Sequence, residues 1–148
     1  MESHTDTATL KELVEVLDDG KKFYLEASEK VDRTDLRQLF SRMARTKGAI
    51  AGDLKTRIVA TGKSAPNDGS LSGSLRKTWG EVRARLSSAP NAEYVDQLEG
   101  FEDRIVHAFR DAAEKSDDAE VRAVAAKYMP EVLRDHGEMS ALKHQLKH

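Results

Sequence analysis

The chain contains no cysteine among its 148 residues. This absence excludes disulfide bonds, thiolate metal sites and cysteine nucleophiles. Proline is also scarce, with three copies, and aromatic residues make up only 5% of the chain. Together with 39% hydrophobic and 34% charged residues, this composition suits a helical bundle better than a disordered chain.

The chain also lacks a strong net charge and a long apolar run. Its formal net charge is −2, so no global field attracts nucleic acid or an anionic membrane, and neither is expected as a partner. No stretch approaches the roughly 18 apolar residues that a membrane-spanning helix needs. The first residues show neither the basic region nor the apolar run of a secretory signal, so we expect a cytoplasmic location.

An internal repeat organises what is present. Residues 24–37, YLEASEKVDRTDLR, return without a gap as residues 109–122, FRDAAEKSDDAEVR, 85 positions later. Each copy is typical of the end of one helix, a polar turn and the start of the next helix. The repeat therefore predicts two helical hairpins in one domain, with Asp32 and Asp117 ending one helix and helping to start the next.

Apolar residues at spacings of three and four place the helices along the chain. We expect a flexible N-terminus over residues 1–8 and a single bundle over 9–148, with helices at about 9–31, 35–60, 72–87, 91–115 and 118–146. A capping box formed by Thr9 and Glu12 is expected to start the first helix. Pro130 lies inside the last helix and is expected to bend or divide it.

Small or polar residues interrupt these apolar faces at two places. Gly20, in the first helix, is expected to face inward and let a neighbouring helix approach closely. In the second helix, Thr46 and Lys47 stand between Met43 and Ile50, where apolar residues would be expected. Two interpretations stay open for this gap, namely a loose or partner-facing turn and a polar site inside the bundle.

Two hairpins joined by one long crossover form the ferritin-like arrangement of an all-α four-helix bundle, here with a short extra helix in the crossover. Several short marks occur in order along the chain: Asp19-Gly20 with Tyr24 and Ala27, Leu39-Phe40, Ala44-Arg45, Gly73-Ser74-Leu75-Arg76 with Trp79, Glu99-Gly100, Glu102-Asp103, and His136. In their order and spacing the chain resembles the bacterial ferritin-like family called domain of unknown function 2383, over about residues 13–142. The resemblance implies a fold rather than an activity, and ferritin-like relatives suggest a link to stress physiology.

Ferritin-like oxidases bind two irons through one Glu from each of two helices and a Glu-x-x-His from each of the other two. No histidine of this chain has a glutamate three residues before it. The repeat also matches Glu102 with Leu17 and His136 with Ala51, so acidic and histidine ligands do not recur symmetrically. A complete di-iron centre is therefore not expected.

A degenerate metal site is the alternative that the same residues leave open. Glu99, Glu102 and His136 are the candidates to hold one divalent ion, iron or another, with Asp53 or Asp135 nearby. The opposing interpretation makes His136 a core histidine that is hydrogen-bonded to Glu102.

No catalytic or cofactor-binding residue is predicted, because the chain has no cysteine and no recognisable Ser-His-Asp context. The first hypothesis is a non-catalytic structural or interaction protein that acts through self-association, for example as a homodimer, or through a protein partner that the sequence does not identify. The second is a divalent-metal-binding or iron-handling protein. The third is a small-molecule binder that uses the polar gap at Thr46 and Lys47.

Overall fold

A computed structural model describes residues 6–62 and 90–147 of the chain. These residues form four long helices and contain no strand: α1 Thr7–Lys30, α2 Thr34–Ala60, α4 Pro90–Lys115 and α5 Ala119–Lys147. The predicted all-α four-helix bundle is thus confirmed. Residues 1–5 of the predicted N-terminal segment and the predicted crossover helix at 72–87, with Trp79, lie outside the described residues.

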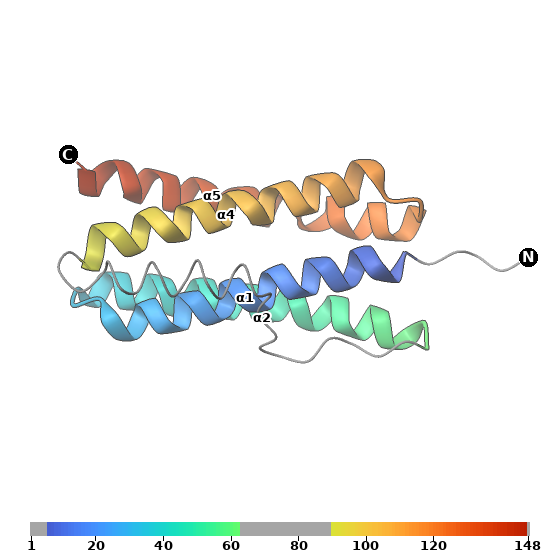
Figure 1. The fold of residues 1–148 in the computed structure, drawn as a ribbon, viewed down its shortest axis with the longest axis horizontal. Coiled ribbons are helices and arrows are strands. Elements are labelled where there is room, and N and C mark those ends of the chain that lie inside the picture. The colour runs from blue at the N-terminus through green and yellow to red at the C-terminus, as the bar shows by residue number, and fades with distance from the viewer. Residues whose placement is uncertain (1–5, 63–89, 148) are drawn as a thin grey trace, which may run out of the picture.

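The helices are arranged as two antiparallel hairpins that lie against each other (Figure 1). Helix α1 packs along α2, and α4 packs along α5, while α1 and α4 make the main contact between the two hairpins. Figure 1 shows that α2 and α4 run in the same direction, whereas α1 and α4 run in opposite directions. This order differs from a simple up-down-up-down bundle and requires one long connection.

The two turns repeat each other in structure as well as in sequence. Arg37 donates through Nε to the backbone oxygen of Val31 at 2.8 Å, and Arg122 donates through Nη1 to the backbone oxygen of Ser116 at 2.6 Å. Both arginines and both acceptors are 85 positions apart. The predicted hairpin repeat therefore corresponds to two equivalent turns.

The start of each hairpin is also tied to the turn of the other. Asp6, just before α1, accepts a hydrogen bond from the Ser116 hydroxyl at 2.8 Å. Its counterpart Asn91, in the first turn of α4, donates through its amide to an Asp32 carboxylate oxygen at 2.7 Å. Each hairpin thus begins against the turn of the other, as expected of two hairpins related by an approximate twofold rotation.

The start of α1 differs from the prediction. The helix begins at Thr7, and its N-cap is Asp6, whose carboxylate accepts from the Thr9 amide at 3.1 Å. Thr9 instead donates its hydroxyl to the other Asp6 carboxylate oxygen at 2.5 Å. The predicted capping box at Thr9 is therefore wrong, because an aspartate three residues earlier offers a charged acceptor for the same helix end.

The second turn also departs from the expected role of Asp117. The carboxylate of Asp118 accepts from the Glu120 amide at 2.8 Å and so caps the start of α5. Helix α5 then continues through Pro130 without a break. Pro130 lies on the exposed side of the helix, where water can satisfy the carbonyl group that loses its partner, so the predicted division does not occur.

The core lies between the hairpins and is built from apolar side chains of all four helices. Gly20 is buried in α1 and faces α4, as expected. A Cβ atom at Gly20 would lie 3.0 Å from Cε1 of Phe101 and 3.4 Å from Cδ1 of Ile105. Within the described ranges, none of the helices combines the length and the apolar character needed to cross a lipid bilayer.

Candidate functional site

Each helix contributes one polar side chain to the same buried place in the bundle. These four residues, named here the polar quartet, are Tyr24 of α1, Lys47 of α2, Glu102 of α4 and Asp135 of α5. Their exposed fractions are 0%, 2%, 0% and 5% in that order. Charged side chains are rarely buried to this extent unless they are paired, so the quartet is the most unusual feature of the interior.

The quartet is held together by direct polar contacts. The Tyr24 hydroxyl donates to Oε1 of Glu102 at 2.7 Å, and Nζ of Lys47 forms an ion pair with the same oxygen. Nζ of Lys47 also lies 3.5 Å from Oδ2 of Asp135 and 4.8 Å from the centre of the Tyr24 ring. Lys47 is therefore the centre of the group and links α2 to the three other helices.

Gly20 provides the room for the Lys47 side chain. A Cβ atom at position 20 would lie 3.2 Å from Cδ of Lys47, closer than an ordinary van der Waals contact. The missing side chain lets the aliphatic stem of Lys47 pass α1 and bring its ammonium group to Glu102. The glycine and the lysine, which interrupt two separate apolar faces in the sequence, thus belong to one arrangement.

Burial and neighbouring charges shift two of the four pKa values. Burial, and secondarily the negative charge of Glu102, raises the pKa of Asp135 to about 6, although Lys47 opposes the shift. Burial and the adjacent Glu102 carboxylate raise the pKa of the Tyr24 hydroxyl well above its ordinary value. Tyr24 therefore stays protonated as a hydrogen-bond donor, and Asp135 is the group that takes up a proton under mildly acidic conditions.

Asp19 of α1 has a buried carboxyl group outside the quartet. Burial raises the pKa of Asp19 to about 6, and the negative charges of Glu15 and Asp18 add to the shift. Oδ1 of Asp19 is buried and accepts no hydrogen bond in the described part of the chain. Asp135 and Asp19 are thus two buried carboxyl groups whose pKa is raised to about 6.

The three predicted metal ligands are not brought together. Glu102 is occupied by Lys47 and Tyr24, whereas Oε1 of Glu99 lies 3.9 Å from Nζ of Lys143. Nε2 of His136 lies 3.5 Å from Oδ1 of Asp103, and its side chain is 30% exposed. Over residues 6–62 and 90–147 the structure contains no group of three or more His, Asp or Glu side chains arranged to hold a metal ion.

The alternative predicted for His136 is also not observed. Its partner is Asp103 rather than Glu102, because the ring lies toward the edge of the bundle and not in its core. The two auxiliary acids separate as well. Asp53 accepts a hydrogen bond from the Tyr128 hydroxyl at 2.5 Å, and Asp135 belongs to the polar quartet.

The polar gap in α2 divides into two different environments. Lys47 points into the interior, which agrees with the interpretation of this gap as a polar site inside the bundle. Thr46 lies beside it on a shallow hollow of about 230 Å³, which is also lined by Ala49, Ile50, Tyr128 and Glu131.

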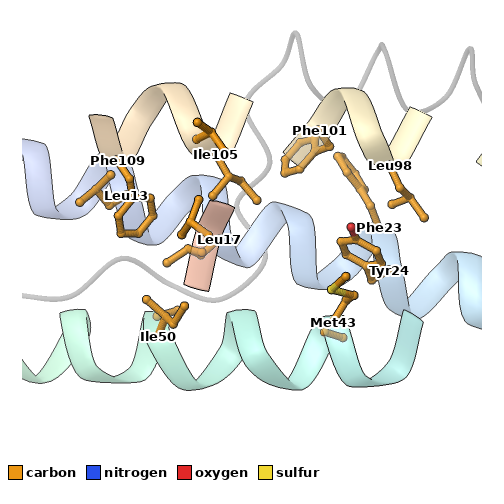
Figure 2. Packing of buried hydrophobic residues seen from close by; sticks show 14 of the residues in the cluster. Leu13, Leu17, Phe23, Tyr24, Met43, Ile50, Leu98, Phe101, Ile105 and Phe109 are labelled. Carbon is orange, nitrogen blue, oxygen red and sulfur yellow. The ribbon is translucent and has the colours of Figure 1, made fainter. Parts of the chain in front are cut away.

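The repeat shows how the same layer is built in the other half of the bundle. The positions 85 residues away from the polar quartet in the sequence all hold apolar residues, named here the apolar quartet. Phe109 corresponds to Tyr24, Val132 to Lys47, Leu17 to Glu102 and Ile50 to Asp135. All four are buried members of the hydrophobic core. In the close-up of Figure 2, Tyr24 lies on one side of the view, above Met43, and Leu17, Ile50 and Phe109 lie toward the other side.

Sequence reasoning identified parts of the polar quartet without assembling it. Lys47 stood out as a polar residue on an apolar face, and Glu102 stood out as an acid without a counterpart in the first hairpin. Tyr24 was indistinguishable from an ordinary core residue. Comparing Lys47 with Val132 and Asp135 with Ile50 across the repeat shows that both positions are charged in one copy and apolar in the other, and the structure shows that the two charged residues meet.

Fold and site together define an all-α four-helix bundle with a charged, hydrogen-bonded group in its interior. The family model described as Domain of unknown function (DUF2383) matches residues 6–115. The chain belongs to this family. The match includes Tyr24, Lys47 and Glu102 but ends with α4, so Asp135 and His136 lie beyond it. No curated protein matches the chain.

Proposed function

We propose that the protein is a ferritin-like bundle without an oxidase centre, which acts as a non-catalytic structural or interaction protein. The observation that supports this function is the ammonium group of Lys47 among the carboxylates of the interior. Ferritin-like di-metal proteins direct ligands from all four helices to the centre of the bundle. Here the four helices instead direct a tyrosine, a lysine and two acids to one place.

The charge of Lys47 makes this group of residues unsuited to a divalent cation. A metal ion bound to Glu102 would lie within a few ångströms of a buried ammonium group, and like charges repel strongly where water is excluded. The ammonium group already provides the positive charge that Glu102 requires. The donors therefore fit a buried ion pair and do not fit a di-iron site.

Metal analysis of protein purified without a histidine tag tests this function. We expect no stoichiometric iron or other divalent metal, and no oxygen consumption when ferrous ion is added. Two irons per chain together with oxygen consumption would contradict the proposal. The alternative, metal binding at Glu99, Glu102 and His136, predicts that Glu102→Ala and His136→Ala each abolish calorimetric binding of a divalent ion.

We further propose that the bundle associates with itself, as a homodimer, or with a protein partner in the bacterial cytoplasm, in the context of stress physiology. The ferritin-like resemblance supports the link to stress, and the long amphipathic helices support self-association. Light scattering of the purified protein measures the number of chains. A strictly monomeric protein over the micromolar range would remove the homodimer from this proposal.

A further inference from the structure

The polar quartet makes the two halves of an approximately symmetric bundle different from each other. We propose that it is a pairing determinant, which makes the first hairpin (α1 and α2) accept only the second hairpin (α4 and α5) as its partner. The second hairpin can come from the same chain or from a second copy. What the quartet prevents is the pairing of a hairpin with another copy of itself.

The approximate twofold symmetry makes such self-pairing geometrically available. The turns are equivalent through Arg37 and Arg122, and each hairpin begins against the turn of the other, through Asp6 and Asn91. Gly20 and Ile105, which are 85 positions apart, lie against each other where the hairpins meet. A hairpin that meets its own copy would therefore find the same backbone surface.

The side chains decide between these arrangements. If the first hairpin paired with itself, each Lys47 would face Leu17 and Ile50 of the other copy, because these residues replace Glu102 and Asp135 across the repeat. Two ammonium groups would then be buried without a counter-charge. A buried charge without a partner is strongly destabilising, so this pairing is disfavoured.

Self-pairing of the second hairpin is disfavoured for the complementary reason. Each Glu102 would face Val132 and Phe109 of the other copy in place of Lys47 and Tyr24. Glu102 and Asp135 of both copies would be buried without a cation. Only the combination of a first and a second hairpin places Lys47 opposite the acids.

This restriction matters because self-pairing joins separate chains. A first hairpin bound to the first hairpin of a second chain leaves both second hairpins free to pair with each other or with further chains, and the latter gives an open-ended assembly. Pairing of a first with a second hairpin can be satisfied within one chain, without a second copy. The polar quartet thus removes like-with-like pairing as a route to larger assemblies.

The apolar quartet indicates that the layer does not need polar residues in order to pack. Replacing a buried ion pair by apolar residues of similar volume is often neutral or stabilising, whereas the best-attested role of buried polar groups is to specify register and partner. The apolar quartet provides such a replacement within the same fold. Specific pairing is therefore the role that distinguishes the polar quartet from its apolar counterpart.

The test transfers the apolar quartet into the polar layer of the full chain. The variant carries Tyr24→Phe, Lys47→Val, Glu102→Leu and Asp135→Ile together, and it is refolded from urea beside the wild type. We expect helical circular dichroism equal to that of the wild type. We also expect a population of higher mass than the wild type, which grows with protein concentration in sedimentation velocity.

A smaller variant and a matched control complete the design. Lys47→Met with Glu102→Leu removes the buried ion pair together with the acceptor of the Tyr24 hydroxyl, and we expect it to shift the mass in the same direction. Arg42→Gln with Glu138→Gln removes an exposed ion pair that also joins α2 to α5, and we expect its mass to equal that of the wild type.

Two results would overturn the pairing role. One is a fourfold variant that folds and keeps the wild-type mass at every concentration. The other is the loss of helicity in both the fourfold variant and the smaller variant, which would show that the polar quartet is needed for folding itself.

Discussion

Removing the ammonium group of Lys47 while keeping its acidic partners is the sharpest perturbation of this interior. In Lys47→Met the thioether fills much of the space of the lysine stem beside Gly20, so loss of packing is small. What changes is the charge: Glu102 keeps its hydrogen bond from Tyr24 at 2.7 Å but loses its cation. Asp135 loses the ammonium group 3.5 Å away.

The size of the effect follows from burial. Breaking a buried ion pair by removing one partner typically costs about 3–5 kcal/mol, because the remaining charge is left uncompensated. Both Lys47 and Glu102 are almost fully buried, with exposed fractions of 2% and 0%, so we expect a value in that range. For a domain of this size such a loss lowers the melting temperature by very roughly 10 °C.

Urea unfolding followed by circular dichroism at pH 7.5 measures the loss, and a second variant isolates its cause. Lys47→Met with Glu102→Leu removes both charges of the ion pair, but Asp135 stays without its ammonium group and the Tyr24 hydroxyl loses its acceptor. We therefore expect this double variant to recover part of the stability that the single variant loses. A single variant that loses less than about 1 kcal/mol, or a double variant as unstable as the single one, would refute the reasoning.

Two further predictions concern a proton and a side chain in the same interior. The pKa of Asp135 is raised to about 6, so the folded protein binds a proton at this carboxyl group more tightly than the unfolded chain does. The stability that this proton contributes is complete below about pH 4 and is lost as the pH rises through 6. In urea titrations, the free energy of unfolding of Asp135→Asn should therefore equal that of the wild type near pH 4 and exceed it by up to about 3 kcal/mol above pH 7. Equal free energies of unfolding at both pH values would contradict this prediction. Gly20→Ala should destabilise the bundle by about 1–2 kcal/mol, because its Cβ atom would lie 3.0 Å from Phe101 and crowding outweighs the gain in helix propensity. Gly100→Ala is the matched control, since a Cβ atom there meets nothing within 4 Å, and calorimetric melting should show it stabilised by up to about 1 kcal/mol.

Local sequence signals were sufficient for most of the fold. Spacing of apolar residues placed the four described helices, and the repeat placed both turns at equivalent positions. The start of α1 could not be decided in this way, because Asp6 and Thr9 are both good capping residues only three positions apart. The deciding contact is the hydrogen bond from Ser116 to Asp6, and it joins residues more than a hundred positions apart in the sequence.

The same limit explains the outcome for the site. In the sequence, Glu102 is an acid without a counterpart in the first hairpin, and an acid in a helical bundle of this type is readily interpreted as a metal ligand. Which cation it meets depends on how the hairpins face each other, and no periodicity within one helix contains that information. Glu102 is buried in the core, whereas the side chains of Glu99 and His136 are partly exposed and have separate partners in Lys143 and Asp103.

The difference between the two copies has a consequence for how such a bundle can be specific at all. Two hairpins with similar backbones and similar turns differ as pairing partners only through their side chains. Exposed ion pairs such as Arg42 with Glu138 contribute little, because water screens them and competes for their partners. A buried charge is different, since the wrong partner leaves it without compensation and the cost is several kcal/mol. Placing Lys47 on one hairpin and both acids on the other therefore concentrates the distinction in the layer where an error costs most.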